Sequence, residues 1–253
     1  MSKFRIIPIV LTDGVNTLKG EQFNPWRPVG IIQSALNIYE SRDVDEFVLI
    51  DVSARSKSTS IDQALIKVAC ETLSVPLTIG GGLTSVDQIR ASLKAGADKV
   101  ILGTSAFTNP NLVSEASLEF GSQAIICSLD IASNNQNIVY TQGGQKKLEL
   151  DAIQAAQNLE RLGAGELLIQ LVDLEGKLSG INLEIANKIM RNVNIPVSVG
   201  GGISDPKDFL QIYKSGFSGA VVGALFQFTE NTPNSIRDFL ASMGVEVRNK
   251  FKS

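Results

Sequence analysis

Acidic side chains that follow apolar segments are the first candidates for chemistry in this chain. A carboxylate at the end of a buried strand is partly desolvated, which raises its pKa toward the range useful for proton transfer. The chain has no histidine, so acid–base chemistry falls to carboxylates, Lys, Tyr or Cys, and we expect neither a metal nor a cofactor. Asp130 is the strongest candidate for catalysis, although a structural Asp bonded to loop amides fits the same pattern. The full set is Asp51, Asp130, Asp173 and Glu175.

Two glycine triplets, Gly80–Gly82 and Gly200–Gly202, suggest a second kind of chemistry. Each ends a short apolar segment, and another glycine follows 21 residues after its last member. The backbone N–H groups of such a turn bind anions without a cationic side chain. Tight turning alone would also explain the glycines, but two copies favour a substrate with a phosphate at each end. The candidate phosphate-binding residues are Gly82, Gly103, Thr104, Gly202, Gly223 and Ala224.

The triplets belong to a long internal repeat. Val75–Ala106 aligns without a gap on Ile195–Phe226, 120 residues later, and the same offset pairs Glu46 with Glu166. A repeat at this period indicates an architecture of two similar halves. Apolar segments rich in β-formers alternate with amphipathic segments, which is typical of parallel strands joined by helices.

Eight strand–helix units can be traced, and they predict a (βα)8 TIM barrel built from two (βα)4 half-barrels. The single domain would span residues 1–253, with half-barrels of about 1–122 and 123–253. A doubly wound open sheet explains the duplication less well, and no G-x-G-x-x-G motif follows the first strand. The expected strands are Arg5–Leu11, Glu46–Asp51, Pro76–Ile79, Lys99–Leu102, Ala124–Asp130, Glu166–Leu171, Pro196–Val199 and Gly219–Val222, and Thr84 and Ser204 are expected helix N-caps.

In such a barrel the loops after the strands carry the function. Three of these loops are long, Thr12–Gly30, Val52–Ser60 and Ile131–Leu148, and long loops in a compact domain are often lids. The third has the pattern of a β-hairpin that turns at Gly143–Gly144.

Four charged residues begin strands at the other end of the barrel. They are Arg5, Glu46, Lys99 and Glu166. Because side chains alternate along a strand, all four would lie in one ring at the bottom. A stabilising salt-bridge ring and a functional ring both fit this spacing.

Composition narrows the classes of function. The chain of 253 residues is 43% hydrophobic and carries a net charge of −3, which gives no reason to expect nucleic acid or an acidic membrane surface as a partner. Cys70 and Cys127 stand alone in apolar segments, as buried thiols do in a reducing compartment. The N-terminal apolar run is too short for a signal peptide or a membrane span. We therefore expect a cytoplasmic protein.

The chain resembles the cyclase subunit of imidazole glycerol phosphate synthase, the ammonia-using barrel of histidine biosynthesis, over essentially its whole length. The motifs that carry the resemblance include RIIP (Arg5–Pro8), DEFVLID (Asp45–Asp51), AGADKV (Ala95–Val100), EGKLSG (Glu175–Gly180) and MGVEVR (Met243–Arg248). The resemblance implies a heterodimer with a glutaminase (a glutamine amidotransferase) docked at the barrel bottom. It also implies that ammonia enters through a gate and moves up the barrel interior to a phosphorylated small-molecule substrate.

The resemblance assigns these roles to particular residues. Arg5, Glu46, Lys99 and Glu166 match the ammonia gate, and Asp98 and Gln123 match the docking face. The two phosphate sites carry over to Gly82 and Thr104, and to Gly176, Gly202 and Gly223. Lys19 and Asp51 complete the candidate substrate-binding set, beside Gly103 and Ala224.

The chain departs from the family pattern at residues that the family uses for catalysis and substrate binding. The family's cyclase uses two aspartates; Asp130 matches the second, but Leu11 stands in place of the first. Gly103 replaces an Asn, and Ala224 replaces a Ser. This pattern resembles divergent paralogues of surface-polysaccharide gene sets, in which the barrel passes ammonia to a separate ATP-dependent sugar amidotransferase. The alternatives are a genuine cyclase of histidine biosynthesis and a non-catalytic ammonia conduit. An unrelated phosphosugar isomerase barrel would not need the charged gate.

Overall fold

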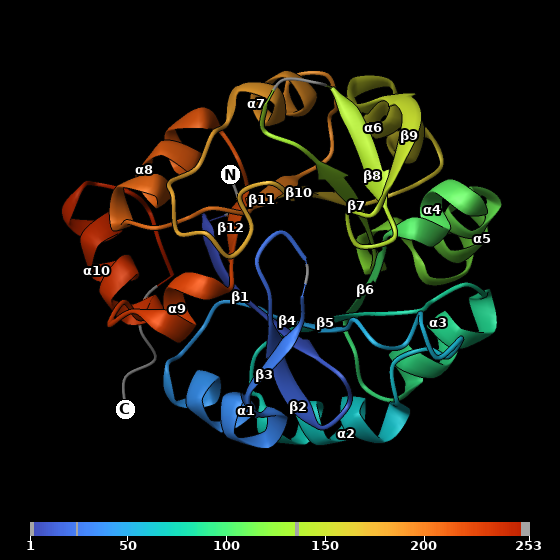
Figure 1. Cartoon of the computed structure of the whole chain (residues 1–253), viewed down its shortest axis with the longest axis horizontal. Coiled ribbons are helices and arrows are strands. Elements are labelled where there is room, and N and C mark those ends of the chain that lie inside the picture. Colours follow the sequence, from blue (N-terminus) through green and yellow to red (C-terminus); the bar gives the residue numbers. More distant parts are fainter. Residues whose placement is uncertain (1–2, 24, 135–136, 249–253) are drawn as a thin grey trace.

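The computed structural model of the protein describes residues 3–23, 25–134 and 137–248, and within these residues eight parallel strands close into a barrel. Their order around the barrel is β10-β11-β12-β1-β4-β5-β6-β7, and pairing of β7 with β10 completes the circle. Figure 1 shows the helices as an outer ring around these strands. The strands are β1 (Arg5–Thr12), β4 (Phe47–Asp51), β5 (Leu77–Gly80), β6 (Lys99–Leu102), β7 (Ile125–Ile131), β10 (Glu166–Leu171), β11 (Val197–Gly200) and β12 (Gly219–Val222). The predicted TIM barrel is confirmed.

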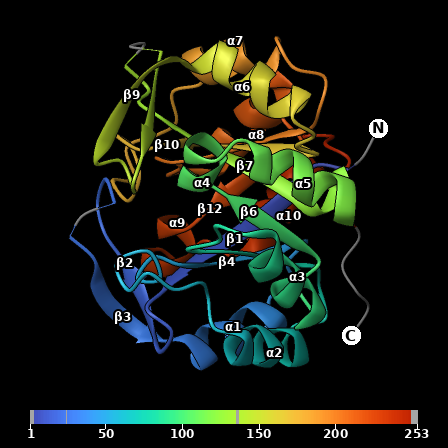
Figure 2. The same ribbon diagram turned by 90° about the vertical axis from the view of Figure 1, so that its right-hand side faces the viewer.

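A helix, or a pair of helices, follows each of these strands and covers the barrel wall (Figure 2). In the longer helices the buried residues lie on one stripe and are mostly alanine, leucine, isoleucine and phenylalanine, as expected for amphipathic helices that cover a barrel. The helices are α1 (Ile32–Ser41), α2 (Gln63–Thr72), α3 (Val86–Lys94), α4 (Thr104–Thr108), α5 (Asn111–Phe120), α6 (Ala152–Arg161), α7 (Glu184–Met190), α8 (Pro206–Ser215), α9 (Ala224–Phe228) and α10 (Pro233–Ser242), and a 3₁₀ turn, η1 (Ser122–Ala124), precedes β7.

The helix N-caps of α3 and α8 differ from the prediction by one residue. Ser85 caps α3 and accepts a hydrogen bond from the Gln88 N–H, and Asp205 caps α8. Thr84 and Ser204, the expected caps, stand one residue earlier. Both positions carry residues that can cap a helix, so the sequence does not show which of the two is the N-cap. The backbone decides, because the N-cap is the residue with extended φ and ψ directly before the first helical turn.

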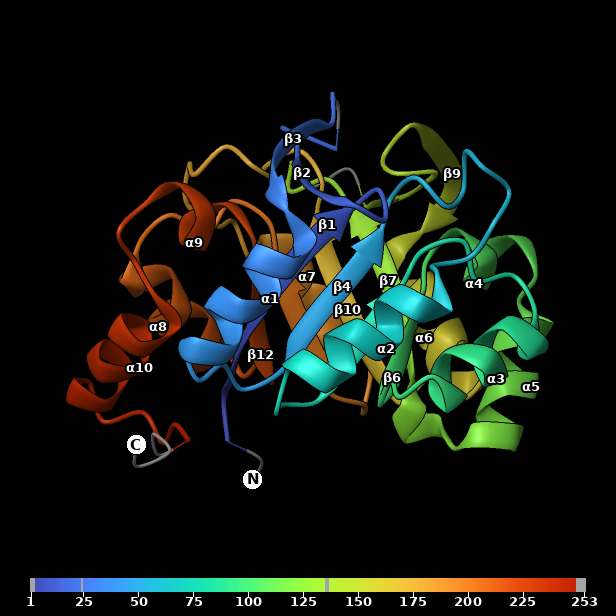
Figure 3. The ribbon, with the colours of Figure 1, turned by 90° about the horizontal axis from the view of Figure 1, so that it is seen from below.

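Two antiparallel hairpins rise from the C-terminal ends of the strands, which form the mouth of the barrel (Figure 3). The predicted hairpin is present as β8 (Ile138–Thr141) and β9 (Lys146–Asp151), with positive φ at Gly143 and Gly144. The loop after β1 contains a second hairpin that the sequence did not predict, β2 (Asn16–Lys19) and β3 (Arg27–Ile31). Residue 24 of this loop and residues 135–136 of the loop before β8 lie outside the described part of the chain.

The apolar residues divide into two clusters. The larger lies between the strands and the surrounding helices, and the smaller fills the inside of the barrel. The inner cluster contains Ile7, Ile9, Leu11, Leu18, Val48, Ile101, Ile126, Leu168 and Val221. Alternate residues of each strand therefore face the interior, and the two ends of that interior hold the candidate site.

Candidate functional site

The four charged residues at the N-terminal ends of the strands meet inside the barrel. Arg5 donates a hydrogen bond of 2.7 Å to Glu46 and one of 2.6 Å to Glu166. The Lys99 ammonium lies 2.8 Å from Glu46 and 3.7 Å from Glu166. Strand alternation thus brings the four into a single ring, as predicted, and this ionic ring lies across the bottom of the barrel.

Electrostatics within the ionic ring shifts the pKa values of Glu46 and Arg5. Burial by itself raises the pKa of the Glu46 carboxyl, but the charges of Arg5 and Lys99, with hydrogen bonds from Lys99 and Thr78, outweigh it and hold that pKa below its usual value. For Arg5, burial lowers the pKa, and the two carboxylates raise it by more. Glu46 and Arg5 therefore stay ionised at neutral pH, and their ion pair persists.

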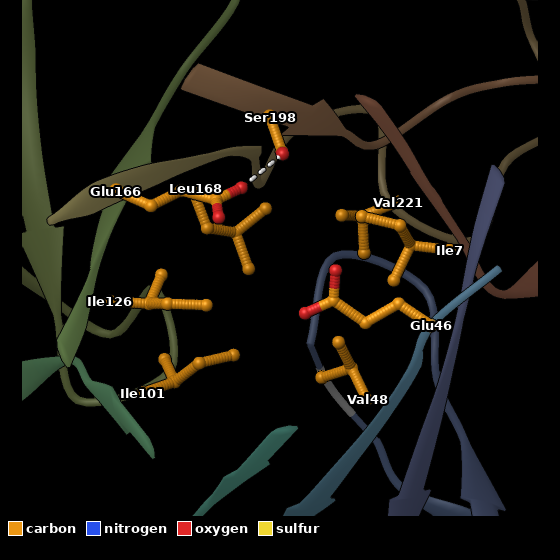
Figure 4. A pocket seen from close by; sticks show the side chains of 9 residues that line it. All are labelled: Ile7, Glu46, Val48, Ile101, Ile126, Glu166, Leu168, Ser198 and Val221. Carbon is orange, nitrogen blue, oxygen red and sulfur yellow. Dashed lines mark hydrogen bonds between the residues drawn. The ribbon is translucent and has the colours of Figure 1, made fainter. Parts of the chain in front are cut away.

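A small cavity lies directly on the mouth side of the ionic ring (Figure 4). Glu46, Glu166 and Ser198 line its ring side, and Ser198 donates a hydrogen bond of 2.6 Å to Glu166. Its walls are apolar and consist of Ile7, Val48, Ile101, Ile126, Leu168 and Val221. A small neutral molecule that passed the ring would enter this apolar layer, whereas an ion would lose its hydration there at high cost.

Asp130 lies at the other end of the interior, on β7. The hydroxyl of Ser128, two residues earlier on the same strand, donates a hydrogen bond of 2.9 Å to the carboxyl. Burial raises the pKa of Asp130 to about 6, and the bond from Ser128 offsets this only in part. A carboxyl with such a pKa can accept and return a proton near neutral pH, which suits the role that the sequence suggests.

The residue across the barrel mouth from β7 is apolar. β1 stands four places from β7 in either direction around the barrel, so the ends of these two strands face each other. Leu11 is 7% exposed there, pairs with Leu18 across β1 and β2, and belongs to the inner apolar cluster against which Trp26 packs. A leucine side chain cannot transfer a proton, and Asp130 therefore has no carboxylate partner at this position.

Both glycine triplets make the same turn. Gly82 and Gly202 have φ of +66° and +85°, a conformation that residues other than glycine rarely adopt. A Cβ on Gly82 would lie 1.9 Å from the Thr59 carbonyl oxygen, and one on Gly202 would lie 2.5 Å from that of Gly180. The repeat is thus preserved in geometry. Backbone packing accounts for the glycines, and phosphate binding at these turns stays a prediction.

A buried ion pair joins the two sides of the mouth. The Lys19 ammonium lies 3.0 Å from Glu175, and the two residues are 2% and 5% exposed. A Cβ on Gly223 would lie 2.3 Å from Lys19 Nζ, and one on Gly176 would lie 2.3 Å from the Gly20 carbonyl oxygen. Lys19, Gly176 and Gly223, three predicted substrate-binding residues, therefore meet in one place. A phosphate at the Gly223 turn would contact a fixed cation.

The other predicted phosphate turn lies under the β8–β9 hairpin. The backbone N–H of Gln142 donates a hydrogen bond of 2.9 Å to the hydroxyl oxygen of Thr104. A hydroxyl can also donate, and a ligand at this turn would be an acceptor for the Thr104 hydroxyl hydrogen. Gly103, directly before Thr104, has open space where a side chain would stand. In the second half, the counterpart of Thr104 is Ala224, which is buried.

Two of the strand-end carboxylates hold loops. Asp51 accepts hydrogen bonds from the N–H and hydroxyl of Ser53 and from the Ala54 N–H. Asp173 accepts bonds from the N–H and hydroxyl of Ser133. These are the structural roles that the sequence left open. For Asp51, contact with substrate stays a prediction.

The predicted docking residues lie at the end of the barrel that holds the ionic ring. Asp98 stands directly before β6 and accepts a hydrogen bond of 2.8 Å from the Leu77 N–H. Gln123 lies in η1, directly before β7. Both residues are exposed, so a partner could reach them.

Sequence reasoning missed two interior polar residues, Ser128 and Gln170. Ser128 donates to Asp130, and Gln170 is the Cα partner of Asp130 on the neighbouring strand β10. Both interrupt otherwise apolar strands, CSLD and LLIQL, and period-two alternation from Asp130 and Glu166 places them on the inner face. That signal was available in the sequence.

In the part of the chain that the structure describes, no group of three or more Cys, Asp or Glu side chains could hold a metal ion. Across the same residues, none of the helices has the length and apolar character needed to cross a membrane.

The chain is similar in sequence to several known proteins over nearly its whole length. A Campylobacter jejuni protein, provisionally named imidazole glycerol phosphate synthase subunit hisF2, is 36% identical over 249 residues, which is 98% of this chain and 99% of the relative. The subunit HisF of the same synthase is 35% identical over 245 residues in Thermococcus onnurineus, covering 96% and 97% of the two chains. In Lactococcus lactis it is 36% identical over 248 residues, covering 96% of each.

The strand order, with its closing β7–β10 pair, defines a (βα)8 barrel built from two half-barrels. The chain belongs to the family of histidine biosynthesis proteins, which matches residues 5–232.

Proposed function

We propose that this chain is a cyclase-type subunit that receives ammonia from a glutaminase partner in a heterodimer. The relatives that match nearly the whole chain are named as imidazole glycerol phosphate synthase subunits. The ionic ring of Arg5, Glu46, Lys99 and Glu166, with an apolar cavity directly behind it, supports entry of a neutral molecule from the bottom of the barrel. Asp98 and Gln123, exposed beside this ring, support a partner at the same end.

We further propose that the chemistry at the mouth has diverged toward amidination of a sugar in surface-polysaccharide biosynthesis. One observation carries this step. Leu11 lies buried with Leu18 in the inner apolar cluster, across the mouth from Asp130, where a second proton-transferring group would be needed. Loss of one member of an acid–base pair costs roughly 10²–10⁴-fold in rate. Ammonia would then leave the mouth for a separate ATP-dependent sugar amidotransferase.

The genuine cyclase is the second candidate. In that reaction ammonia attacks the ribulosyl carbonyl of a bisphosphorylated aminoimidazole-carboxamide nucleotide, and Asp130 handles protons during cleavage and ring closure. The pKa of Asp130 near 6 and the Lys19 ammonium beside Gly223 favour it. A non-catalytic conduit is the third candidate, and it would need neither of these features.

The deciding experiment supplies the purified chain with the bisphosphorylated ribulosyl nucleotide and an ammonium salt, and measures imidazole glycerol phosphate. We expect turnover at least 10²-fold below that of an ordinary cyclase and a gain in the Leu11→Asp variant. Leu11→Asn is the matched control, because asparagine has the same shape as aspartate but transfers no proton. Ordinary turnover in the unmodified chain would refute the divergence, and failure to co-purify with any glutaminase would refute both enzyme candidates.

A further inference from the structure

Gln170 is a polar residue inside an otherwise apolar strand. All six residues of β10 are buried, and Glu166, Leu168 and Gln170 face the interior in turn. Glu166 belongs to the ionic ring, and Leu168 lines the cavity behind it (Figure 4). Gln170 therefore comes next on the way from the ring to the mouth. Its Cα partners on the adjacent strands are Asp130 and Gly200.

The orientation of the Gln170 amide is determined by its neighbours. Its Nε2 donates a hydrogen bond of 2.8 Å to Oε2 of Glu175, whose Oε1 accepts one of 3.0 Å from Lys19. A carboxylate paired with a lysine can only accept hydrogen bonds. The amide nitrogen must therefore face Glu175, and the carbonyl oxygen must face the other way. The Lys19–Glu175 ion pair thus acts as a fixed support for the amide.

The carbonyl oxygen that results is buried and unsatisfied by the protein. Gln170 is 6% exposed, and none of the described residues donates a hydrogen bond to its Oε1. A Cβ on Gly200 would lie 2.9 Å from this oxygen, so glycine leaves space beside it. Buried acceptors without a donor are rare because leaving one unpaired is costly. A small hydrogen-bond donor would relieve this cost.

We propose that Gln170 Oε1 is a binding site for ammonia between the ionic ring and Asp130, an inference that rests on the proposed function. Ammonia is a neutral molecule with three N–H donors, so it can cross the apolar layer around Leu168 and then donate to this oxygen. An ammonium ion would pay a large desolvation penalty in that layer. Because Asp130 stands next to Gln170 across the sheet, ammonia held here waits beside the carboxyl at the mouth. Water shares the donor chemistry, and the test must separate the two.

The primary test does not depend on any product. Crystals of the full chain are soaked in methylamine at alkaline pH, since this amine is larger than water and gives elongated density. We expect such density within hydrogen-bond distance of Gln170 Oε1, and its loss in Gln170→Met, which has similar length but no acceptor. Ile169→Val, a change on the helix side of the same strand, should keep it. Only round, water-like density, or none, at Oε1 in the unmodified chain would overturn the proposal.

A kinetic test adds a second readout. In the assay of imidazole glycerol phosphate formation from an ammonium salt, Gln170→Met should raise the KM for ammonium about three- to tenfold. This factor corresponds to the binding free energy lost with one neutral hydrogen bond. The KM for the phosphorylated substrate should not change, which a general loss of structure would not produce. An unchanged KM for ammonium would count against the site. If the unmodified chain shows no turnover, the proposed cyclase chemistry fails, while the methylamine result still decides the binding site.

Discussion

Replacement of Arg5 by methionine tests the energetics of the ionic ring. Methionine keeps part of the aliphatic length of arginine but removes one of the two cations that Glu46 and Glu166, only 4% and 8% exposed, share. Removal of one partner from a buried ion pair costs roughly 3–5 kcal/mol. Lys99 stays within 2.8 Å and 3.7 Å of the two carboxylates, and the Arg5 side chain is itself 22% exposed. We therefore expect a smaller loss of about 2–3 kcal/mol at neutral pH.

Calorimetry and urea unfolding of Arg5→Met measure this loss. A domain of this size loses roughly 2–4 °C of Tm per kcal/mol, so Tm should fall by about 4–12 °C. Arg90→Met is the matched control, because Arg90 pairs with Asp87 and Glu119 at the surface, and it should change Tm little. Equal shifts in the two variants would refute the view that the ring is a stabilising buried network.

The pH dependence of Arg5→Met gives an independent check. The folded protein holds the pKa of Glu46 below its unfolded value, so the stability that this contributes is present above the unfolded pKa. It is lost as the pH falls through the folded pKa. The gap in unfolding free energy between the unmodified chain and Arg5→Met should therefore narrow as the pH falls below the unfolded value of about 4.5. A gap that is constant or that widens on acidification would contradict the assigned charges.

Two further predictions concern the mouth. Burial raises the pKa of Asp130 to about 6 from a normal 3.8, so ionisation of Asp130 disfavours the folded state as the pH rises through that window. Asp130→Asn should therefore stabilise the chain by about 1–3 kcal/mol at pH 8 and little at pH 4. Urea unfolding at the two pH values measures this difference. Gly82→Ala and Gly202→Ala should each lower stability by at least about 2 kcal/mol, because a Cβ would collide with a carbonyl at positive φ. Gly103→Ala, with open space and negative φ, is the control, and an equal loss there would refute the argument.

Much of the architecture could be predicted because its signals are local. Most strands of the barrel are apolar segments that end at or next to a glycine or an acidic residue, and the 120-residue offset indicates two similar halves. Strand alternation alone places Arg5, Glu46, Lys99 and Glu166 in one ring, since parallel strands of a closed barrel begin at the same end. The turn at Gly143–Gly144 likewise follows from residues that tolerate positive φ.

The β2–β3 hairpin could not be predicted in the same way. Its strands NTLK and RPVGI are short, one contains proline, and β3 is exposed throughout. The pairing depends on contact with β1, whose Leu11 lies opposite Leu18. Without that tertiary support, neither strand has a pattern that distinguishes it from an irregular loop.

The sequence by itself determined the barrel, the ionic ring, and the replacement of a carboxylate by Leu11 at the end of the first strand. Only the tertiary structure decided which polar groups of the mouth form ion pairs, which bind loop amides and which have a shifted pKa. Lys19 and Glu175 are 156 residues apart, and Asp51 and Asp130 stand at similar strand ends, yet one holds loop amides and the other has a raised pKa. The physical reason is that a pKa and an amide orientation depend on groups brought close in space, and the distance along the chain carries no information about those contacts.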